Sequence, residues 1–303
     1  MSKKIKLGIE KIFNIIYPLL KFEWIQHTMR NLGFKLPYYR FAEKLDYRGV
    51  VDFVVNNKRL YLQSYNQPIE MFIFWYGIFG EWESTQLKLW SALVKQSDIV
   101  LDIGANTGVY SLIATTNSEA KIYAFEPVPD VVKMLEKNIE LNQPNNIFLK
   151  TQLIGDRIGS ETLYIPRSGW VDVASVNKEF ANNYRQGNVM TELPCPMTTV
   201  DAFLDELNIT DDLSVLCKID VEGAEERVLQ GMVNAMRSRR LTFMIEILNK
   251  DYFSRLYNML PQEYEIIAID EGQKKIYKVQ EFANGVTNYL CSKQNLSSAD
   301  FNL

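Results

Sequence analysis

The sequence VLDIGANTGV at residues 100–109 decides the fold of this chain. Together with Ile99, its first four positions are mostly apolar or β-branched, which is typical of a strand buried on both faces of a parallel sheet. Gly104 and Gly108 allow backbone conformations and close approaches that a Cβ would block. Residues 110–115 can continue as a helix. The stretch therefore predicts a strand, a loop that faces a ligand, and a helix whose first N–H groups favour an anion.

The glycine spacing narrows the class of ligand. A dinucleotide fingerprint needs G-x-G-x-x-G, but counting from Gly104 its other two glycine positions hold Asn106 and Val109. The pattern from Asp102 to Gly108 is D-x-G-x-x-x-G instead. It suits a nucleoside that lacks a pyrophosphate and has an amino-acid tail, because the ammonium needs an acceptor and the carboxylate suits a helix N-terminus. S-adenosylmethionine has both groups.

A second acid follows at the end of the next predicted strand. The sequence AFEP at residues 124–127 ends an apolar run that begins at Lys121, and Glu126 lies at the distance along the chain expected of an acid that binds ribose hydroxyls. Asp102 and Glu126 are therefore expected to bind the two ends of one cofactor. Gly104, Asn106 and Gly108 form the loop between them.

Five motifs in order give this chain a family resemblance. They are VLDIGANTGVYSL, AFEP, LIGDRIG, TTVDAFL and KIDVEGAEERVLQGM. The set resembles the FkbM family of S-adenosylmethionine-dependent methyltransferases from about residue 80 to about residue 290. The resemblance implies an α/β, Rossmann-like class I methyltransferase fold with a mostly parallel seven-stranded sheet and an antiparallel last strand.

The same resemblance suggests further site residues. It implies that Asp156 accepts from the adenine amino group, although Asp156 is equally suited to be a turn acid before Arg157. Within GEWE at residues 80–83, Glu83 resembles a family glutamate that meets the ligand, and a surface helix residue is the alternative. Leu248 occupies the position where many family members have a histidine, so a role resting on that histidine cannot be transferred.

Three acids are the candidates for catalysis. Asp220 and Glu222 follow a buried strand over residues 214–219, and Glu246 lies near the end of the strand over residues 242–247. Open α/β sheets bind ligands along this carboxyl edge. Asp220 is the first choice for a general base, and Lys218 needs an acid such as Asp220 because an unpaired lysine inside a sheet is costly. The same three acids could instead hold Mg²⁺.

A simpler interpretation of the acids needs no catalysis. Glu222 and Glu225 precede or begin a helix predicted over residues 224–236, where negative charge favours the positive end of the helix. Residues 157–194 lack regular patterning and are expected to line the substrate, with Trp170 as a stacking candidate. The tail strands over 264–269 and 286–292, joined by a polar turn at residues 271–273, are expected to complete the sheet.

Composition and length predict two parts. The chain has 303 residues, 47% of them hydrophobic, which is enough for a methyltransferase domain over residues 96–303. Residues 1–95 form a predicted appendage, with an amphipathic helix, a hairpin over residues 49–62 and a helix over residues 77–95. Three widely separated cysteines and a single histidine, His27, argue against disulfides, a zinc site and a histidine-ligated metal, and predict a reducing, cytoplasmic location.

The net charge and the N-terminal segment indicate which partners to expect. A net charge of −4 without a basic cluster argues against nucleic acid. Residues 5–20 place apolar side chains at helical spacing behind a basic start, which predicts a helix packed on its own domain or, alternatively, peripheral contact with a membrane. Charges at Glu10 and Lys11 disfavour a signal peptide, and the segment is too short to span a bilayer.

The resemblance implies methylation of a hydroxyl on a sugar, a lipid-linked glycan or a natural product. Methylation of an amine is the nearest alternative, and a cofactor-binding protein that has lost catalysis is an alternative of another class. The identity of the acceptor and the oligomeric state stay open at this stage.

Overall fold

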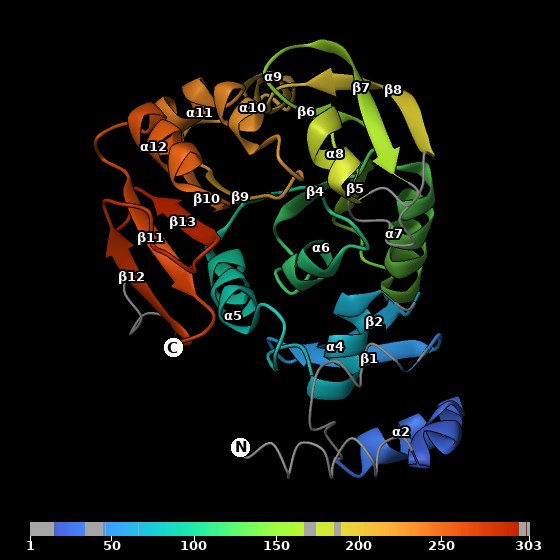
Figure 1. Cartoon of the computed structure of the whole chain (residues 1–303). Helices are drawn as coiled ribbons and strands as arrows, with labels where there is room; N and C mark the ends of the chain where they lie inside the picture. Colours follow the sequence, from blue (N-terminus) through green and yellow to red (C-terminus); the bar gives the residue numbers. More distant parts are fainter. Residues whose placement is uncertain are drawn as a thin grey trace. The chain divides into compact units, whose positions relative to one another are not determined.

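The computed structural model describes residues 15–33, 45, 47–65, 67–166, 174–184, 189–296 and 301. It divides into two compact units, Met1–Ser84 and Thr85–Leu303 (Figure 1). Among the described residues, no helix is long and apolar enough to cross a membrane. Residues 5–14 of the predicted N-terminal helix and Trp170 lie outside the described residues.

The first unit contains the predicted hairpin. Strands β1 (Val50–Val55) and β2 (Lys58–Gln63) pair antiparallel, and Asn56 and Asn57 adopt φ values of 50° and 64° in the two-residue turn between them. Two successive residues with positive φ match the right-handed twist of the strands, which is why asparagine is favoured there. The hairpin is therefore confirmed. It is accompanied by a helical segment over residues 15–20, by α2 (Glu23–Asn31) and by α4 (Pro68–Tyr76).

The expected helix over residues 77–95 is wrong at its start. Gly77 ends α4 with a φ of 80°, a backbone conformation that a right-handed helix cannot continue. The next helix, α5, covers Ser84–Leu93 and leads into a 3-10 turn at Val94–Gln96. The carboxylate of Glu271 accepts from the backbone N–H groups of Thr85 (2.9 Å) and Gln86 (2.8 Å), so it caps the first turn of α5 from a distant part of the chain.

The second unit is built on an eight-stranded sheet in the order β12-β11-β13-β10-β9-β3-β4-β5. Strands β10, β9, β3, β4 and β5 are parallel, and β13 lies antiparallel between β10 and β11. The bounds are β3 (Ile99–Ile103), β4 (Lys121–Phe125), β5 (Ile147–Lys150), β9 (Ser214–Ile219), β10 (Arg240–Glu246), β11 (Glu265–Asp270), β12 (Lys275–Val279) and β13 (Asn288–Ser292). The predicted α/β fold with a mostly parallel sheet is confirmed.

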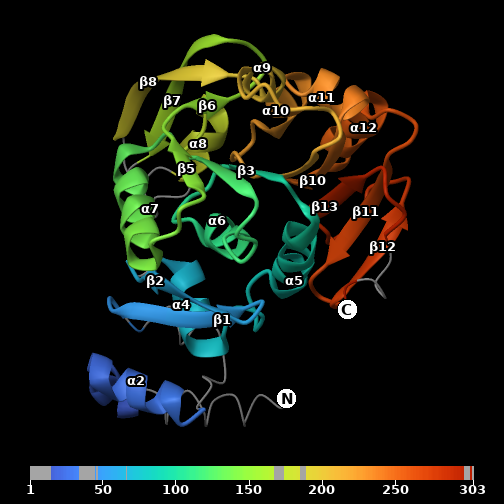
Figure 2. The same ribbon diagram turned by 180° about the vertical axis from the view of Figure 1, so that it is seen from behind.

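Helices cover both faces of this sheet. Helices α9, α10, α11 and α12 lie on one side, and α5, α6 and α7 on the other, as Figures 1 and 2 show from opposite directions. Their bounds are α6 (Val109–Ala114), α7 (Pro129–Asn142), α9 (Val200–Glu206), α10 (Glu225–Gln230), α11 (Val233–Ser238) and α12 (Lys250–Met259). Because both faces are covered, every residue of β3 is buried.

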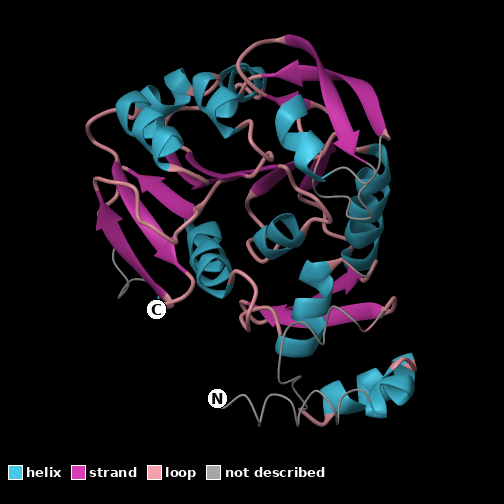
Figure 3. Ribbon diagram, in the orientation of Figure 1, coloured by secondary structure: helices cyan, strands magenta, loops and turns pink. Residues whose placement is uncertain are grey.

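A separate three-stranded sheet follows β5. It has the order β6-β8-β7, from β6 (Leu153–Ile154), β7 (Gly159–Pro166) and β8 (Met190–Thr198), and α8 (Lys178–Tyr184) lies between β7 and β8 in the chain (Figure 3). The apolar stretch over residues 147–154 is therefore two strands, β5 and β6, in two different sheets. Helix 224–236 is likewise split, into α10 and α11, at Gly231. A Cβ on Gly231 would lie 1.9 Å from the backbone oxygen of Gly155.

The sheet also has one strand more than the seven predicted. The polar turn at residues 271–273 leads into β12, which pairs with β11 at the edge, and only then does the chain return as β13. The strand β12 alternates weakly in burial, and only Ile276 of its five residues is buried. An edge strand with one buried residue gives little apolar pattern in the sequence.

Candidate functional site

The register of the sheet brings four predicted residues to one edge. Ile219 of β9 is the partner of both Ile103 of β3 and Ile245 of β10, and Ile103 is also the partner of Phe125 of β4. The residues that follow these positions are Gly104, Glu126, Asp220 and Glu246. They therefore leave the sheet at the same level, at the carboxyl ends of four adjacent parallel strands, where open α/β sheets bind ligands.

The glycine loop after β3 is packed directly against the end of β9. Gly104 has a φ of 84°, and a Cβ on it would lie 1.8 Å from the backbone oxygen of Asp220. Gly108 has a φ of 93°, and its Cβ would lie 2.3 Å from Leu135 Cδ1 of α7. Asn106, between them, is a non-glycine residue at φ 49°. Both glycines are thus required by backbone conformation and by close approach.

The first N–H groups of this loop are bonded within the protein. Gly104 and Ala105 both donate to the backbone oxygen of Phe125, at 3.0 and 2.9 Å. Asn106 donates to Glu126 Oε2 at 3.0 Å, and Val128 donates to Glu126 Oε1 at 2.9 Å. The carboxylate of Glu126 therefore joins the loop after β3 to the turn after β4.

Glu126 is the most electrostatically perturbed acid of the edge. It is 6% exposed, and burial raises its pKa from 4.5 to about 7, although the two backbone N–H groups oppose the shift. Each carboxylate oxygen has further lone-pair capacity beyond its one backbone donor. Glu126 can consequently accept additional hydrogen bonds from a ligand, and such bonds would favour its charged form.

Asp102 lies deeper than the edge, in β3 itself. It is 1% exposed, its Oδ2 accepts from Ser111 Oγ at 2.6 Å, and burial raises its pKa to about 6. Its neighbour on β9 is Lys218, whose charge lowers the pKa in opposition to burial. Asp102 thus fastens α6 to the sheet. Its expected contact with a cofactor ammonium stays a prediction.

Lys218 is buried and paired with Asp220, as expected from its position in the sheet. Its side chain is 2% exposed, and Lys218 Nζ lies 2.8 Å from Asp220 Oδ2 and 5.0 Å from the ring centroid of Tyr110. Asp220 is 33% exposed, and its Oδ1 has no hydrogen bond among the described residues. One oxygen of Asp220 is therefore fixed while the other is available.

The turn after Asp220 is shaped by groups that the sequence analysis did not assign. Glu222 has a φ of 54°, and its backbone oxygen accepts from Ser175 Oγ at 2.6 Å. Phe180 of α8 packs on Gly223, where a Cβ would lie 2.8 Å from its ring. The segment between β7 and β8 therefore touches this turn at Glu222 and Gly223. Its expected place beside the substrate stays a prediction. The hydroxyl of Ser175 gave no signal in the sequence.

Glu225 has the structural role that the simpler interpretation proposes. Its buried carboxylate accepts from the N–H groups of Val221 (3.2 Å) and Gly223 (3.0 Å), and burial raises its pKa. Glu225 therefore holds the turn that carries Asp220 and Glu222.

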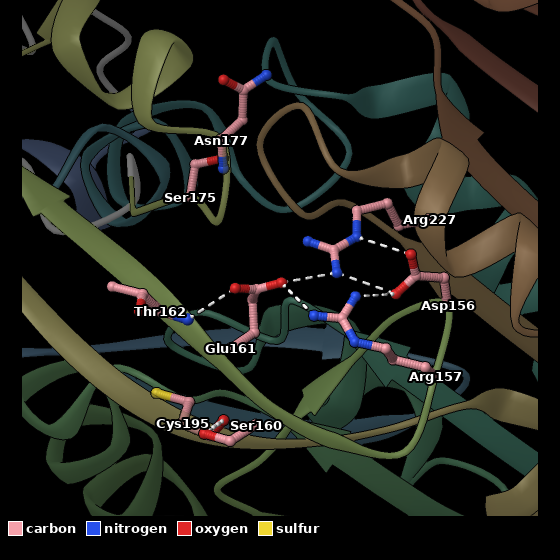
Figure 4. A network of polar contacts seen from close by, with 9 residues as sticks. All are labelled: Asp156, Arg157, Ser160, Glu161, Thr162, Ser175, Asn177, Cys195 and Arg227. Atoms are coloured by element: carbon pink, nitrogen blue, oxygen red, sulfur yellow. Dashed lines mark hydrogen bonds and ion pairs between the residues drawn. The ribbon is translucent and has the colours of Figure 1, made fainter.

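Asp156 belongs to an ion-pair network outside the central sheet (Figure 4). It follows β6, and its carboxylate accepts from Arg227 of α10 at 2.9 and 3.3 Å and from Arg157 at 3.2 Å. Glu161 accepts from the same two arginines, at 2.9 Å each. These bonds hold the pKa of Asp156 and of Glu161 below their ordinary values. The expected contact of Asp156 with adenine stays a prediction.

Two further predicted residues are Glu246 and Glu83. Glu246 ends β10 beside Asn288 of β13. Glu83 lies in the first unit with a φ of 42° and stays a prediction. Among the described residues, no three His, Cys, Asp or Glu side chains are grouped so that they could hold a metal ion. The Mg²⁺ alternative for Asp220, Glu222 and Glu246 therefore has no support from the described residues.

Comparison with known proteins gives two curated relatives that match part of this chain. Hexuronic acid methyltransferase AglP of Haloferax volcanii is 30% identical over 161 residues, which cover 52% of this chain and 59% of that protein. AMB antimetabolite synthetase AmbE of Pseudomonas aeruginosa is 26% identical over 180 residues, which cover 50% of this chain and 8% of that protein. The chain therefore spans less than two thirds of the length of these relatives.

Solved structures of methyltransferases are also similar to this chain. A Methyltransferase FkbM from Methylobacillus flagellatus is 14% identical and has a TM-score of 0.38, with 65% of this chain and 44% of that chain covered. A putative O-methyltransferase from Klebsiella pneumoniae is 11% identical and has a TM-score of 0.40, with 70% and 81% covered.

The family itself is given by a domain model. The model of the Methyltransferase FkbM domain matches residues 102–279, from Asp102 in β3 to the end of β12, and so includes the whole row of edge residues. Since this match covers more than half of the chain, the protein belongs to the FkbM methyltransferase family.

Proposed function

We propose that this protein transfers a methyl group from S-adenosylmethionine to a hydroxyl oxygen of a sugar, a glycan or a natural product. The observation that carries the proposal is the alignment of Gly104, Glu126 and Asp220 at one sheet edge in a chain of the FkbM methyltransferase family. The name of one relative, a hexuronic acid methyltransferase, supports a sugar as the acceptor class.

The residues of the edge fit the cofactor. Glu126 offers a buried carboxylate with remaining lone pairs for two ribose hydroxyls, beside a loop whose glycines, Gly104 and Gly108, let its backbone pack closely on Asp220 and Leu135. Asp102 supplies negative charge below that loop for the cofactor ammonium. When bound, S-adenosylmethionine supplies an electrophilic methyl group on a sulfonium. The side chains of the protein then have to bind, orient and deprotonate the acceptor.

Asp220 is the proposed general base. Lys218 holds Asp220 Oδ2, and Oδ1 is available to take the proton of an acceptor hydroxyl while the acceptor oxygen gains the methyl group. A positioned carboxylate contributes roughly 10²- to 10⁴-fold to such a transfer. The larger contribution comes from holding the reacting atoms in line, because displacement at a methyl carbon needs little other chemistry. Glu222 and Glu246 are the second candidates for the base.

The acceptor is proposed to bind against the segment between β7 and β8. Ser175 and Phe180 of that segment already touch the turn after Asp220. A substrate bound there would have its hydroxyl next to the carboxylate that deprotonates it. Loops that differ between relatives set substrate choice on a shared scaffold.

The test begins with calorimetric titration of the purified protein with S-adenosylhomocysteine, with NAD as the control ligand. We expect saturable binding of the first and none of the second. A labelled-methyl assay with sugars, uronic acids and glycans then searches for the acceptor. Binding without transfer to any extract would favour a cofactor-binding protein without catalysis. A methylated amine as the product would identify nitrogen as the acceptor atom.

A further inference from the structure

The N-terminal segment presents large apolar side chains to solvent. Among the described residues, those in this segment that are exposed are Ile15, Leu19, Phe22, Trp24 and Leu32, each between 55% and 78%. Ile15 and Leu19 are one helical turn apart, and Trp24 and Leu32 are two turns apart on α2 and its C-cap. We refer to these five side chains as the N-terminal apolar patch. Isolated exposed apolar residues are ordinary, but five within eighteen positions are not.

Helix α2 buries a polar side chain and exposes a large aromatic one. Its buried residue is Gln26, with 0% exposure, whereas Trp24 is 68% exposed. Polar contacts attach α2 to the hairpin: Arg30 forms a 2.9 Å ion pair with Asp52, and His27 bonds to the hydroxyl of Tyr47. Because large apolar side chains are normally buried, the exposure of Trp24 on α2, together with that of Phe22 and Leu32 beside the helix, indicates a partner.

The charge of the same segment indicates the chemistry of that partner. Residues 1–33 contain six Lys or Arg and two Glu, a net charge of +4, in a chain whose net charge is −4. The remaining residues therefore hold a net −8, so an anionic surface attracts this segment and repels the rest of the chain. Lys21 lies inside the patch, with its Nζ 5.1 Å from the ring centroid of Tyr17.

We propose that the N-terminal apolar patch docks on the surface of an anionic lipid membrane. Trp24 and Phe22 are suited to the region between lipid headgroups and acyl chains, where aromatic rings with adjacent cations are favoured. Lys21 can extend along its aliphatic stem to reach a lipid phosphate. This inference concerns the first unit alone and does not depend on methyl transfer. It adds a site of attachment to the proposed function.

The test is co-sedimentation of the full chain with vesicles of phosphatidylcholine, with and without phosphatidylglycerol. We expect binding to the anionic vesicles, weaker binding to the neutral ones, and release by salt. Phe22→Ser combined with Trp24→Ser should reduce partitioning by about tenfold or more, since burial of such rings is lost. Lys21→Ala should reduce it by about fivefold.

Matched variants separate the patch from general surface effects. Ile158→Ser combined with Tyr257→Ser removes two apolar side chains that are 72% and 48% exposed in the second unit, and should leave vesicle binding unchanged. Lys133→Ala is the control for charge. Absence of binding to anionic vesicles, or unchanged binding of the Phe22/Trp24 double variant, overturns the proposal. So does a dimer in solution that this double variant dissociates while vesicles bind neither protein.

Discussion

The backbone oxygen of Asp220 lies where a side chain on Gly104 would have to be, since a Cβ built on Gly104 would stand 1.8 Å from it. The cofactor loop and the turn that carries the proposed base are thus in backbone contact. Asp220 also donates its N–H to the backbone oxygen of Ile103, at 3.0 Å. A displacement of one element must therefore displace the other.

Replacement of Gly104 tests this contact. Gly104→Ala adds a strained positive φ and a clash with backbone, so we expect a loss of about 1–3 kcal/mol or more in unfolding free energy and loss of S-adenosylhomocysteine binding. Gly285→Ala is the matched control, because Gly285 has a φ of 82° but nothing within 4 Å of its Cβ position. Denaturation and calorimetry measure both. Equal effects of the two substitutions would contradict the importance of the contact.

The raised pKa of Glu126 predicts a pH dependence of stability. Its ordinary pKa is 4.5, and in the fold it is about 7. As pH rises between these values, the unfolded chain loses the proton that the folded chain keeps, so stability from this group falls and stays low above about pH 7. Glu126→Gln removes that slope, worth up to about 3 kcal/mol. Denaturation of the wild type and of Glu126→Gln at several pH values measures the difference between their unfolding free energies.

The substitution also has an effect that does not depend on pH. The amide that Glu126→Gln introduces would turn an NH₂ group toward the backbone N–H of Asn106 or of Val128, both of which donate to the carboxylate in the native protein. This constant loss is about 1–3 kcal/mol. The slope is therefore the decisive measurement, and parallel pH curves would show that Glu126 ionises as an ordinary acid.

Cofactor affinity should depend on the same ionisation. Ribose hydroxyls donate to the charged carboxylate, so affinity for S-adenosylhomocysteine should rise as pH rises and level off above about pH 7, by up to about tenfold per pH unit. In Glu126→Gln the affinity should be weaker and should keep only the pH dependence that comes from Asp102, whose pKa burial raises to about 6. Calorimetry at several pH values measures both, and a wild-type affinity that is flat with pH would remove Glu126 from the site.

Substitutions of Asp220 and Lys218 should have separate effects, the first on turnover and the second on stability. Asp220→Asn keeps the shape of the side chain, so we expect cofactor affinity near that of wild type and turnover lower by roughly 10²- to 10⁴-fold. Lys218→Met removes the cation between Asp102 and Asp220, and should reduce stability by about 3–5 kcal/mol. Lys137→Met breaks an exposed pair with Glu140 and should cost no more than about 1 kcal/mol. Full turnover in Asp220→Asn would pass the role of base to Glu222 or Glu246.

The ion-pair network distinguishes the two roles of Asp156. Asp156 and Glu161 share Arg157 and Arg227, but the family resemblance connects only Asp156 with adenine. If Asp156 binds adenine, Asp156→Asn should weaken S-adenosylhomocysteine binding by about tenfold, because a hydrogen bond worth about 1–2 kcal/mol is lost. Glu161→Gln should leave the binding unchanged. Equal effects on stability with no effect on affinity would make Asp156 a structural acid.

The residues at the carboxyl edge of the sheet could be predicted because each lies in a short motif at the end of a strand. Three parallel strands, β3, β4 and β9, are followed directly by a glycine or an acid, and β10 ends in an acid. Parallel strands bring their carboxyl ends together whatever the loops do. Asp102, Gly104, Glu126 and Asp220 could therefore be placed from short motifs. The pairing of Lys218 with Asp220 followed from the cost of an unpaired charge inside a sheet.

The missed features depend on contacts between distant residues. Glu271 caps α5 across nearly the whole domain, and Ser175 reaches the carbonyl of Glu222 from the segment between β7 and β8. The split between α10 and α11 follows from Gly231, whose Cβ position lies against Gly155. None of these contacts changes the periodicity of the sequence, so an apolar pattern cannot reveal them.

The backbone contact between Gly104 and Asp220 has a consequence for changing the acceptor by engineering. This contact fixes the glycine loop after β3 and the proposed base relative to each other. Substitutions there are therefore expected to impair methyl transfer to every acceptor alike and to offer no selectivity. The segment between β7 and β8 touches the turn after Asp220 through Ser175 and Phe180. Grafting this segment from one relative to another is accordingly the expected route to a new acceptor, with the donor side retained unaltered.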